Sequence, residues 1–281
     1  MKTASKSLNN SRVYFCSVPI GNDDDITIRV KQQLHITPTI ACEDTRVTKQ
    51  LLKRLGIWQN QSLIRLDQHT ENNQNWAWLA SALLLGPVSV VSDAGTPGIN
   101  DPGAKCMAHC IAHHIPIELL PGVSALTAIM TLSTRPITNL SFKGFFPRQH
   151  AQIIDAITWT VQQQCHCVWF ESPKRLLKTI QQIATQTPSA QLTLAKELTK
   201  PHQKILCGTA AQCAEELAAI DCRGEWVIMM DGASVPADAI VNVTAIAIDL
   251  KQAGLTAKQV KAVAKHMACQ KNELYTAFIG L

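Results

Sequence analysis

The chain has 281 residues, of which 46% are apolar and 17% charged; this is the composition of a globular protein and excludes a disordered chain. No apolar run approaches the roughly 18 residues that a membrane span needs, and the polar start MKTASKSLNNSR lacks the apolar region of a signal peptide. We therefore expect a cytoplasmic protein, without a membrane partner, whose ten cysteines are reduced. The formal net charge of +5 fits an anionic partner such as nucleic acid.

Strand-like and helix-like segments alternate through the first half of the chain. The expected strands are VYFCSVPI (13–20), TPTIAC (37–42), QSLIRL (61–66), PVSVVS (87–92) and PIELL (116–120). The expected helices are DITIRVKQQL (25–34), TRVTKQLLKRLG (45–56), ENNQNWAWLASALL (71–84), DPGAKCMAHCIAHH (101–114) and VSALTAIMTLS (123–133). This alternation predicts βαβ crossovers and therefore a mainly parallel sheet.

A break near TRPITNL (134–140) separates this half from a second alternating region. The strands expected there are SFKGFFP, CHCVWF, QLTLAKEL, KILCG and EWVIMMDG. The expected helices are AQIIDAITWTVQQ, a segment starting at Ser172–Pro173, and CAEELAAI behind a Thr209/Gln212 capping box. We predict a flexible tail over 1–11, two α/β domains over 12–135 and 138–233, and a helical extension over 240–281.

Three glycine-containing loops follow strands of the first predicted domain. They are PIGNDDD (19–25), DAGTPG (93–98) and PGVSA (121–125). In open α/β sheets, ligands bind at the carboxyl ends of the strands, where loops and helix N-termini present N–H groups. The loops match neither the phosphate-binding nor the dinucleotide-binding glycine motif. One such loop alone is typical of a tight turn, but three on one rim predict a small-molecule site.

Charged residues follow three of the predicted strands. In ACEDTR, Glu43, Asp44 and Arg46 lie where a strand meets a helix. They either cap that helix and pair on the surface, or form a cluster that holds a substrate or acts as a base. WFESPKR and AKELTK each place a glutamate beyond a strand, with basic residues after it. That mixture favours substrate contact, although solvated loops have the same composition.

The helix CMAHCIAHH places Cys106, Cys110 and His113 at a spacing that suits metal ligands. The chain offers no second cluster at zinc-like spacing that would complete a site. We therefore expect no metal and interpret the cysteines as small apolar residues on a buried helix face. In CHC (165–167), strand alternation directs both cysteines to the same side.

The segment LTAKQVKAVAKHM predicts a helix that starts with a Thr256/Gln259 capping box. Its apolar residues lie opposite a basic face formed by Lys258, Lys261 and Lys265. This face is either simply solvated or contacts a phosphate backbone, in which case binding depends on salt.

Seven segments of the chain follow one another in the order and spacing of a known family. They are SVPIGNDDDIT, ACEDTR, VSDAGTPGINDPG, LPGVSA, GFFPR, FESPKRL and AKELTK, and KNELY follows in the tail. With them the chain resembles the ribosomal RNA small subunit methyltransferase I family, part of the tetrapyrrole-methylase-like class. The resemblance implies two α/β domains of the tetrapyrrole methylase type, with S-adenosyl-L-methionine bound in a cleft between them. It further implies a homodimer, and 2′-O-methylation of a cytidine in 16S rRNA of the 30S subunit.

The resemblance also implies roles for individual residues. The cofactor residues are Pro19, Gly21, Asp93, Ala94, Gly95, Thr96, Ser124 and Ala125. The residues lining the cleft or contacting substrate are Glu43, Asp44, Arg46, Glu171, Lys174, Arg175, Glu197 and Lys200. Two positions depart from the family pattern, because Gly98 stands where a bulky residue is frequent and Lys174 where histidine is frequent.

A ribose hydroxyl is a weak acid, so its methylation needs a base or a cation that stabilises the developing alkoxide. We expect Glu43 or Glu197 as the base and Arg46 or Lys200 as the stabilising cation. Two alternative functions share the same features. One is a small-molecule methyltransferase acting on a tetrapyrrole, and the other is a non-catalytic RNA-binding assembly factor.

Overall fold

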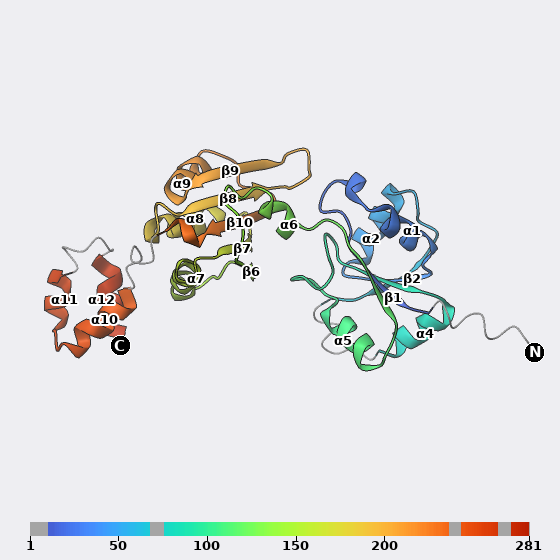
Figure 1. Ribbon diagram of the computed structural model, residues 1–281, viewed down its shortest axis with the longest axis horizontal. Coiled ribbons are helices and arrows are strands. Elements are labelled where there is room, and N and C mark those ends of the chain that lie inside the picture. The colour runs from blue at the N-terminus through green and yellow to red at the C-terminus, as the bar shows by residue number, and fades with distance from the viewer. Residues whose placement is uncertain (1–10, 68–75, 236–242, 264–270, 281) are drawn as a thin grey trace, which may run out of the picture. The chain divides into compact units, whose positions relative to one another are not determined.

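A computed structural model of the protein describes residues 11–67, 76–235, 243–263 and 271–280. The chain divides into two compact units, each built around a five-stranded sheet (Figure 1). The first unit comprises Met1–Leu132 and Ala195–Lys204, and the second comprises Ser133–Leu194 and Ile205–Leu281. The sequence predicted a boundary near 134–140 but did not predict that Ala195–Lys204 groups with the first unit.

The sheet of the first unit has the strand order β3-β2-β4-β1-β5. Its strands are β1 (Val13–Cys16), β2 (Thr39–Cys42), β3 (Ser62–Arg65), β4 (Val88–Val91) and β5 (Ile117–Leu120). Every neighbouring pair is parallel, as the sequence predicted. The central strands β2 and β4 are buried along their whole length. Their near-continuous apolar sequences are typical of a parallel sheet that is covered on both faces.

Helices cover both faces of this sheet (Figure 1). On one face, α1 (Ile28–Ile36) and α2 (Thr45–Arg54) bury Val30, Leu34, Leu51 and Leu52 against Cys16, Ile40, Cys42 and Val91. On the other face, α4 (Ala77–Leu85) and α5 (Ala104–Ala112) bury Leu79, Ala82, Cys106 and Cys110 against Val13, Phe15, Ala41, Val88 and Val90. Both cysteines of α5 are thus core residues, the position expected from the sequence.

The sheet of the second unit is mixed and has the strand order β6-β7-β10-β8-β9. Its strands are β6 (Leu140–Phe145), β7 (His166–Glu171), β8 (Gln191–Lys196), β9 (Lys204–Thr209) and β10 (Trp226–Asp231). The β6–β7 pair is parallel and the β7–β10 pair antiparallel.

One apolar core holds this sheet to α7 (His150–Gln162), α8 (Leu176–Gln186) and α9 (Ala210–Ala218). Cys165 and Cys167 both face that core, with their Sγ atoms 3.6 Å apart. This is the shared orientation that strand alternation predicted. Burial raises the pKa of the Cys167 thiol to about 12, so the thiol stays protonated at neutral pH.

Three helices end the chain: α10 (Val243–Gln252), α11 (Ala257–Val263) and α12 (Lys271–Gly280). They share a small core of Ala247, Val260, Leu274 and Phe278. The capping box predicted for α11 is present, because Thr256 N donates to Gln259 Oε1 at 2.8 Å and Gln259 N donates to Thr256 Oγ1 at 3.5 Å. No helix within the described ranges is long and apolar enough to cross a membrane.

The helix starts show where capping signals succeed and where they fail. The Thr209/Gln212 capping box at α9 is confirmed. The predicted start of α8 at Ser172–Pro173 is wrong, because this helix begins at Leu176. Ser172 forms a turn instead, its carbonyl accepting from Arg175 N at 3.0 Å. Its own N–H, which would have faced solvent at a helix start, donates to the carboxylate of the preceding glutamate.

Candidate functional site

The topological switch point of the first sheet lies between the neighbouring strands β4 and β1. β1 leads into α1 on one face of the sheet, whereas β4 leads into α5 on the opposite face. Connections that diverge in this way leave room at the carboxyl ends of the strands, where open α/β sheets bind their ligands. Because β2 and β5 are parallel to these strands, their loops reach the same edge.

Three of these loops are joined to one another by direct contacts. After β1 and β4, Val18 N donates to Gly95 O at 2.8 Å and Gly95 N donates to Val18 O at 3.1 Å. The hydroxyls of Ser17 and Thr96 lie 2.9 Å apart. After β5, a Cβ added to Gly122 would come within 2.9 Å of the Ser17 Cβ. The three loops therefore form one continuous backbone surface with little side-chain bulk.

The residues expected to hold the cofactor lie on this surface. Pro19 and Gly21 follow β1, Asp93, Ala94, Gly95 and Thr96 follow β4, and Ser124 and Ala125 begin α6 (Ala125–Met130). Ser124 caps α6, its hydroxyl accepting from Leu126 N at 3.3 Å. Gly95 has a φ of +72° and Gly98 a φ of +85°, a left-handed conformation that glycine adopts without strain. Glycine at both positions therefore allows the backbone conformation of the loop after β4.

The carboxylates of Glu43, Asp93 and Asp101 gather near the ends of β2 and β4. Asp93 Oδ1 accepts from Asp44 N at 3.0 Å, and Asp93 N points at Glu43 Oε2 from 3.5 Å. Burial, and then the neighbouring charge of Asp93, raise the pKa of Glu43. Burial, and then the charges of Glu43 and Asp93, raise the pKa of Asp101 to about 7. A carboxylate with a pKa like that of Asp101 accepts and releases a proton near neutral pH.

Asp101 is a site residue that the sequence reasoning missed. It lies in VSDAGTPGINDPG, the same segment as Asp93, and a second aspartate there was the only signal. Its importance comes from burial beside Glu43 and Asp93, which spacing does not reveal. Among the residues that the structure describes, no group of three or more His, Cys, Asp or Glu side chains is arranged to hold a metal ion.

Asp44 and Arg46 pair with each other at the start of α2. Asp44 caps the helix through Oδ1, which accepts from Arg46 N at 2.8 Å. Arg46 Nη2 lies 2.6 Å from Asp44 Oδ2, and these hydrogen bonds hold the pKa of Asp44 well below its usual range. The Arg46 side chain is 86% exposed. The capping interpretation is therefore correct for Asp44, while the guanidinium remains accessible to a ligand.

Glu197 and Lys200 lie in the turn between β8 and β9, in the segment that groups with the first unit. Lys200 Nζ donates to Glu197 Oε1 at 3.1 Å. A Cβ on Gly21 would collide with the Lys200 side chain, so the β1 loop and this turn are in contact. A cavity of about 640 Å³ lies at this contact, lined by Gly21, Asn22, Asp23, Asp24, Arg54, Thr199, Lys200 and Pro201.

Glu171 and Arg175 form a buried corner at the end of β7. Glu171 is 2% exposed, and its carboxylate accepts from Ser172 N at 2.7 Å, Thr179 Oγ1 at 2.7 Å and Arg175 Nη2 at 2.9 Å. The same Arg175 nitrogen donates to both carbonyls of Phe146–Pro147 at 2.8 Å. The structure thus places Glu171 in the interior, where it orients Arg175. Arg175 in turn fixes the segment that follows β6.

The remaining predicted contacts are lysines. Lys174 is exposed beside the Glu171 corner. Lys258 and Lys261 are exposed on α11, and Lys261 Nζ lies 5.5 Å from the centroid of the Tyr275 ring. Lys265 lies outside the described residues.

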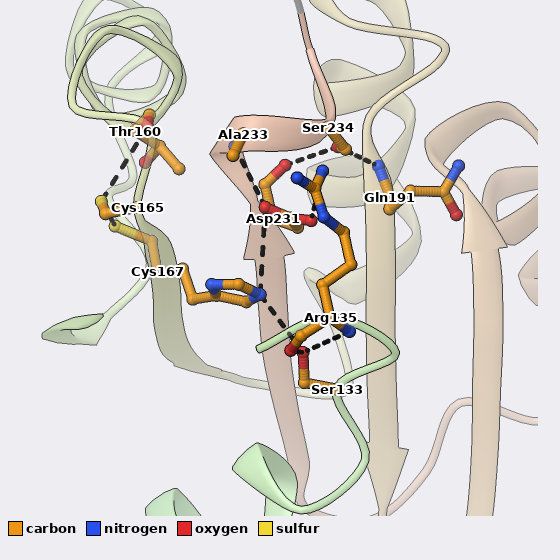
Figure 2. A network of polar contacts seen from close by, with 10 residues as sticks. Ser133, Arg135, Thr160, Cys165, Cys167, Gln191, Asp231, Ala233 and Ser234 are labelled. Carbon is orange, nitrogen blue, oxygen red and sulfur yellow. Dashed lines mark hydrogen bonds and ion pairs between the residues drawn. The ribbon is translucent and has the colours of Figure 1, made fainter. Parts of the chain in front are cut away.

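A serine, a histidine and an aspartate also meet beside β7 and β10 (Figure 2). Ser133 Oγ lies 3.2 Å and Asp231 Oδ1 3.9 Å from the same imidazole nitrogen, Nε2 of His166. In a nucleophilic triad the acid instead contacts the nitrogen opposite the serine. The adjacent cavity of about 30 Å³ has room for one water. With Arg135 Nη1 3.3 Å from Asp231, the network anchors the start of the second unit and lacks the geometry of a hydrolytic site.

The fold and the glycine loops match a known class of proteins. The chain matches the tetrapyrrole (corrin/porphyrin) methylase family over residues 12–214. A solved cobalt precorrin-4 methyltransferase of cobalamin biosynthesis superposes with a TM-score of 0.56 and 15% identity, covering 83% of this chain and 100% of that one. Uroporphyrin-III C-methyltransferase from Thermus thermophilus superposes with a TM-score of 0.52 and 14% identity, with the same coverage. The chain therefore belongs to the tetrapyrrole methylase family.

Sequence relatives narrow the membership further. Ribosomal RNA small subunit methyltransferase I of Mesorhizobium japonicum is 32% identical over 274 residues, 96% of this chain and 92% of the relative. The Mycobacterium tuberculosis protein of that name is 30% identical over 275 residues, 97% and 96% of the two chains. The Helicobacter pylori protein is 32% identical over 238 residues, 78% and 82%. Within its family, the chain belongs with the ribosomal RNA small subunit methyltransferase I proteins, and the resemblance found in the sequence is confirmed.

Proposed function

We propose that the protein transfers a methyl group from S-adenosyl-L-methionine to the ribose 2′-hydroxyl of a cytidine in 16S rRNA. The observation that carries this proposal is the rim of the first sheet, where four adjacent parallel strands bring their loops to the switch point. The relatives, named as rRNA small subunit methyltransferases, support the substrate class. The 2′-hydroxyl and the cytidine follow from the family resemblance.

The rim suits a cofactor with nucleoside and amino acid parts. Gly95 and Gly98 adopt left-handed backbone, and Gly122 has no space for a Cβ, so main-chain groups are free to contact a ligand directly. We place S-adenosyl-L-methionine against Pro19, Gly21, Asp93, Ala94, Gly95, Thr96, Ser124 and Ala125. When bound, it supplies a methyl group that its sulfonium has already activated. Asp93 accepts hydrogen bonds from the amino or ribose groups of the ligand.

Glu43 is the better of the two candidate bases. Its pKa is raised, and Asp93 N at 3.5 Å makes only a long contact with the carboxylate. Glu197, by contrast, accepts from Lys200 Nζ at 3.1 Å, so its carboxylate already has a cationic partner. A base with a raised pKa removes the hydroxyl proton more readily as the oxygen attacks the methyl group. The main task of the remaining residues is to align that oxygen with the methyl group.

Arg46 and Lys200 supply positive charge near this rim. Arg46 is exposed beyond its pairing with Asp44, and Lys200 lies against the β1 loop. A cation next to the attacking oxygen stabilises the alkoxide that develops as the proton leaves. We propose this role for one or both residues.

Contacts with the RNA are assigned to four lysines outside the rim and to Asp44. We propose that Lys174, Lys258, Lys261 and Lys265 contact phosphates, and that Asp44 hydrogen-bonds to the substrate. Each phosphate contact that is removed should reduce the salt dependence of binding by somewhat less than one unit in the log–log slope. We infer 16S rRNA, free or within the 30S subunit, as the partner, a homodimer as the active form and the cytoplasm as the location.

Transfer of radiolabel from S-adenosyl-L-methionine tests the proposal directly. The purified protein is incubated with three acceptors, namely unmodified 30S subunits, free 16S rRNA and a tetrapyrrole. We expect alkali-stable label in a ribose of 30S rRNA, because a 2′-O-methyl group blocks alkaline cleavage at that position. Binding of the cofactor is measured separately by calorimetry.

The other outcomes each contradict part of the proposal. Label found only in the tetrapyrrole would make the protein a small-molecule methyltransferase. Cofactor binding without transfer to any acceptor would remove the rRNA assignment, and RNA binding without cofactor binding would indicate a non-catalytic assembly factor.

A further inference from the structure

Three phenylalanines form a cluster on β6 and β7 that no step of the proposed reaction uses. Phe142 and Phe145 lie on the edge strand β6, and Phe170 lies beside them on β7. The Phe170 ring centroid is 5.1 Å from that of Phe142 and 6.0 Å from that of Phe145, both in edge-on geometry. Phe145 is 58% exposed. We call these three residues the phenylalanine edge.

The backbone presents Phe145 through a β-bulge. Strict strand alternation would put Phe142 and Phe145 on opposite faces, because they are three residues apart. Phe142 pairs with Val168 and Phe145 with Phe170, so one extra residue lies in β6, and Gly144 has a φ of +71°. Phe145 therefore joins Phe142 on one face. The next residue, Phe146, is buried on the other face against Trp169.

The chain directly after Phe145 is held in place by the core and by hydrogen bonds. Phe146 is anchored in the core at 1% exposure, and the carbonyls of Phe146 and Pro147 accept from Arg175, which also pairs with the buried Glu171. An exposed ring on a fixed backbone loses little conformational entropy when it binds a partner. Exposed large apolar side chains that touch one another mark interaction sites more often than isolated ones do.

The two stretches of chain that flank the phenylalanine edge in sequence are rich in basic residues. Residues 140–154 and 172–194 contain no aspartate or glutamate, and they supply Lys143, Arg148, Lys174, Arg175 and Lys178. Glu171, between the two stretches, is buried and already bonded to Arg175. Arg148, three residues after Phe145, is exposed. Aromatic rings among cations are complementary to unpaired nucleotides, whose bases stack on the rings while the phosphates meet the cations.

We propose that the phenylalanine edge stacks an unpaired base of the RNA substrate, with Phe145 as the principal contact and Arg148 on the adjoining phosphate. This inference rests on the proposed function for the identity of the RNA. Arg175 and Glu171 act as positioning residues, because they hold the backbone that carries Phe145. The surface selects single-stranded over duplex RNA, since paired bases are already stacked within the helix.

Fluorescence anisotropy tests the proposal with a labelled single-stranded oligocytidylate and a labelled RNA duplex of equal length. We expect Phe145→Ala to weaken binding of the single strand by on the order of tenfold and to change duplex binding little. Phe145→Trp should restore single-strand binding, because indole stacks at least as well. Ile205→Ala is the matched control, because Ile205 is an exposed apolar residue on β9, the opposite edge strand, and should bind like the wild type.

Several results would overturn the proposal. One is unchanged single-strand affinity in Phe145→Ala. Another is an equal loss for both RNAs, which would indicate a purely electrostatic contact. A change of molecular mass in Phe145→Ala by sedimentation would indicate that a second copy of the chain covers the edge.

The proposed function is tested separately from this surface. Calorimetric binding of S-adenosyl-L-methionine should be the same in all variants. If the wild type failed to methylate rRNA but Phe145→Ala still lost single-strand binding, the proposed RNA surface would be supported and the proposed reaction contradicted. If the wild type methylated rRNA and Phe145→Ala bound the single strand as tightly as the wild type, the proposed reaction would be supported and the proposed RNA surface contradicted.

Discussion

Two corners of the molecule share a sequence pattern but differ in chemistry. In the first unit, Glu43 follows the buried strand β2 and Arg46 comes three residues later. In the second, Glu171 ends the buried strand β7 and Arg175 comes four residues later. Spacing alone predicts similar roles for the two glutamates.

The partners of each carboxylate separate the two corners. Glu171 accepts hydrogen bonds from a backbone N–H, a hydroxyl and a guanidinium, so its charge is fully satisfied inside the protein. Glu43 lies among like charges, since the arginine beside it pairs with Asp44 instead. The first arrangement fixes structure, whereas the second keeps a carboxylate whose pKa is raised. The hydrogen-bond partners of the carboxylate, rather than its position after a strand, therefore distinguish the two glutamates.

Glu43→Gln is the sharpest test of this contrast. We expect it to lower the rate of methyl transfer by roughly 100- to 10,000-fold, because an amide cannot accept the hydroxyl proton. Calorimetric binding of S-adenosyl-L-methionine should not change. Glu215→Gln, at an exposed glutamate on α9, is the control and should stay within a few-fold of the wild-type rate. Full activity in Glu43→Gln would transfer the role of base to Glu197, to be checked by Glu197→Gln.

Glu171→Ala should have the largest effect on stability. It removes the acceptor of three buried hydrogen bonds and leaves the Arg175 guanidinium without its carboxylate. Loss of one partner of a buried ion pair costs about 3 kcal/mol or more, and we expect about 3 kcal/mol because Arg175 is partly exposed. Urea unfolding measures the free energy. A loss below about 0.5 kcal/mol would contradict the structural role of this corner.

Asp101→Asn should change how stability depends on pH. The folded-state pKa of Asp101 is about 7, above the value of about 3.9 in an unfolded chain. Between these values the folded state holds a proton that the unfolded state has lost, so the free energy of unfolding falls as pH rises. Asparagine does not titrate, so the free energy of unfolding of the variant does not fall for this reason. After allowance for solvent screening, the variant should be more stable than the wild type by about 1 kcal/mol near pH 8, and equally stable near pH 4.

Urea unfolding of both proteins across that pH range measures the difference. Parallel stability curves would show that the pKa of Asp101 is not raised. Asp101 would then no longer count among the carboxylates of the first corner whose pKa is raised. Asp24→Asn serves as a control, because Asp24 is an exposed aspartate in the first loop and its replacement should leave the curve unchanged.

The fold was predictable where local pattern and architecture agree. Buried strands alternating with helices predicted the parallel first sheet, and the positions of the glycine-containing loops predicted that they share one edge of it. The direction of β10 against β7 was not predictable, because it depends on how the connecting segments cross the sheet. The start of α8 was missed because Ser172 N bonds to Glu171 across a turn, a contact that capping statistics do not include.

The candidate site was predictable in composition but not in burial. Glu43, Asp93 and the loop glycines came directly from motifs, and their roles in binding and catalysis remain predictions. The interior position of Glu171 depends on Thr179, eight residues away on α8. The exposure of Phe145 depends on the bulge at Gly144, which shifts the alternation by one residue. Each of these features is set by tertiary contacts that a linear pattern does not contain.

Arg46→Ala should have the smallest effect on stability and completes the comparison. Its side chain is 86% exposed and pairs with Asp44 on the surface. Exposed ion pairs contribute little to stability, so we expect almost no loss, whereas Arg175→Ala should destabilise the protein clearly. If Arg46 stabilises the developing alkoxide, the rate of methyl transfer should nonetheless fall by about tenfold or more with cofactor binding unchanged. Because the fold is almost unaffected, such a decrease reports on the reaction itself, and an unchanged rate would leave Lys200 as the only proposed cation.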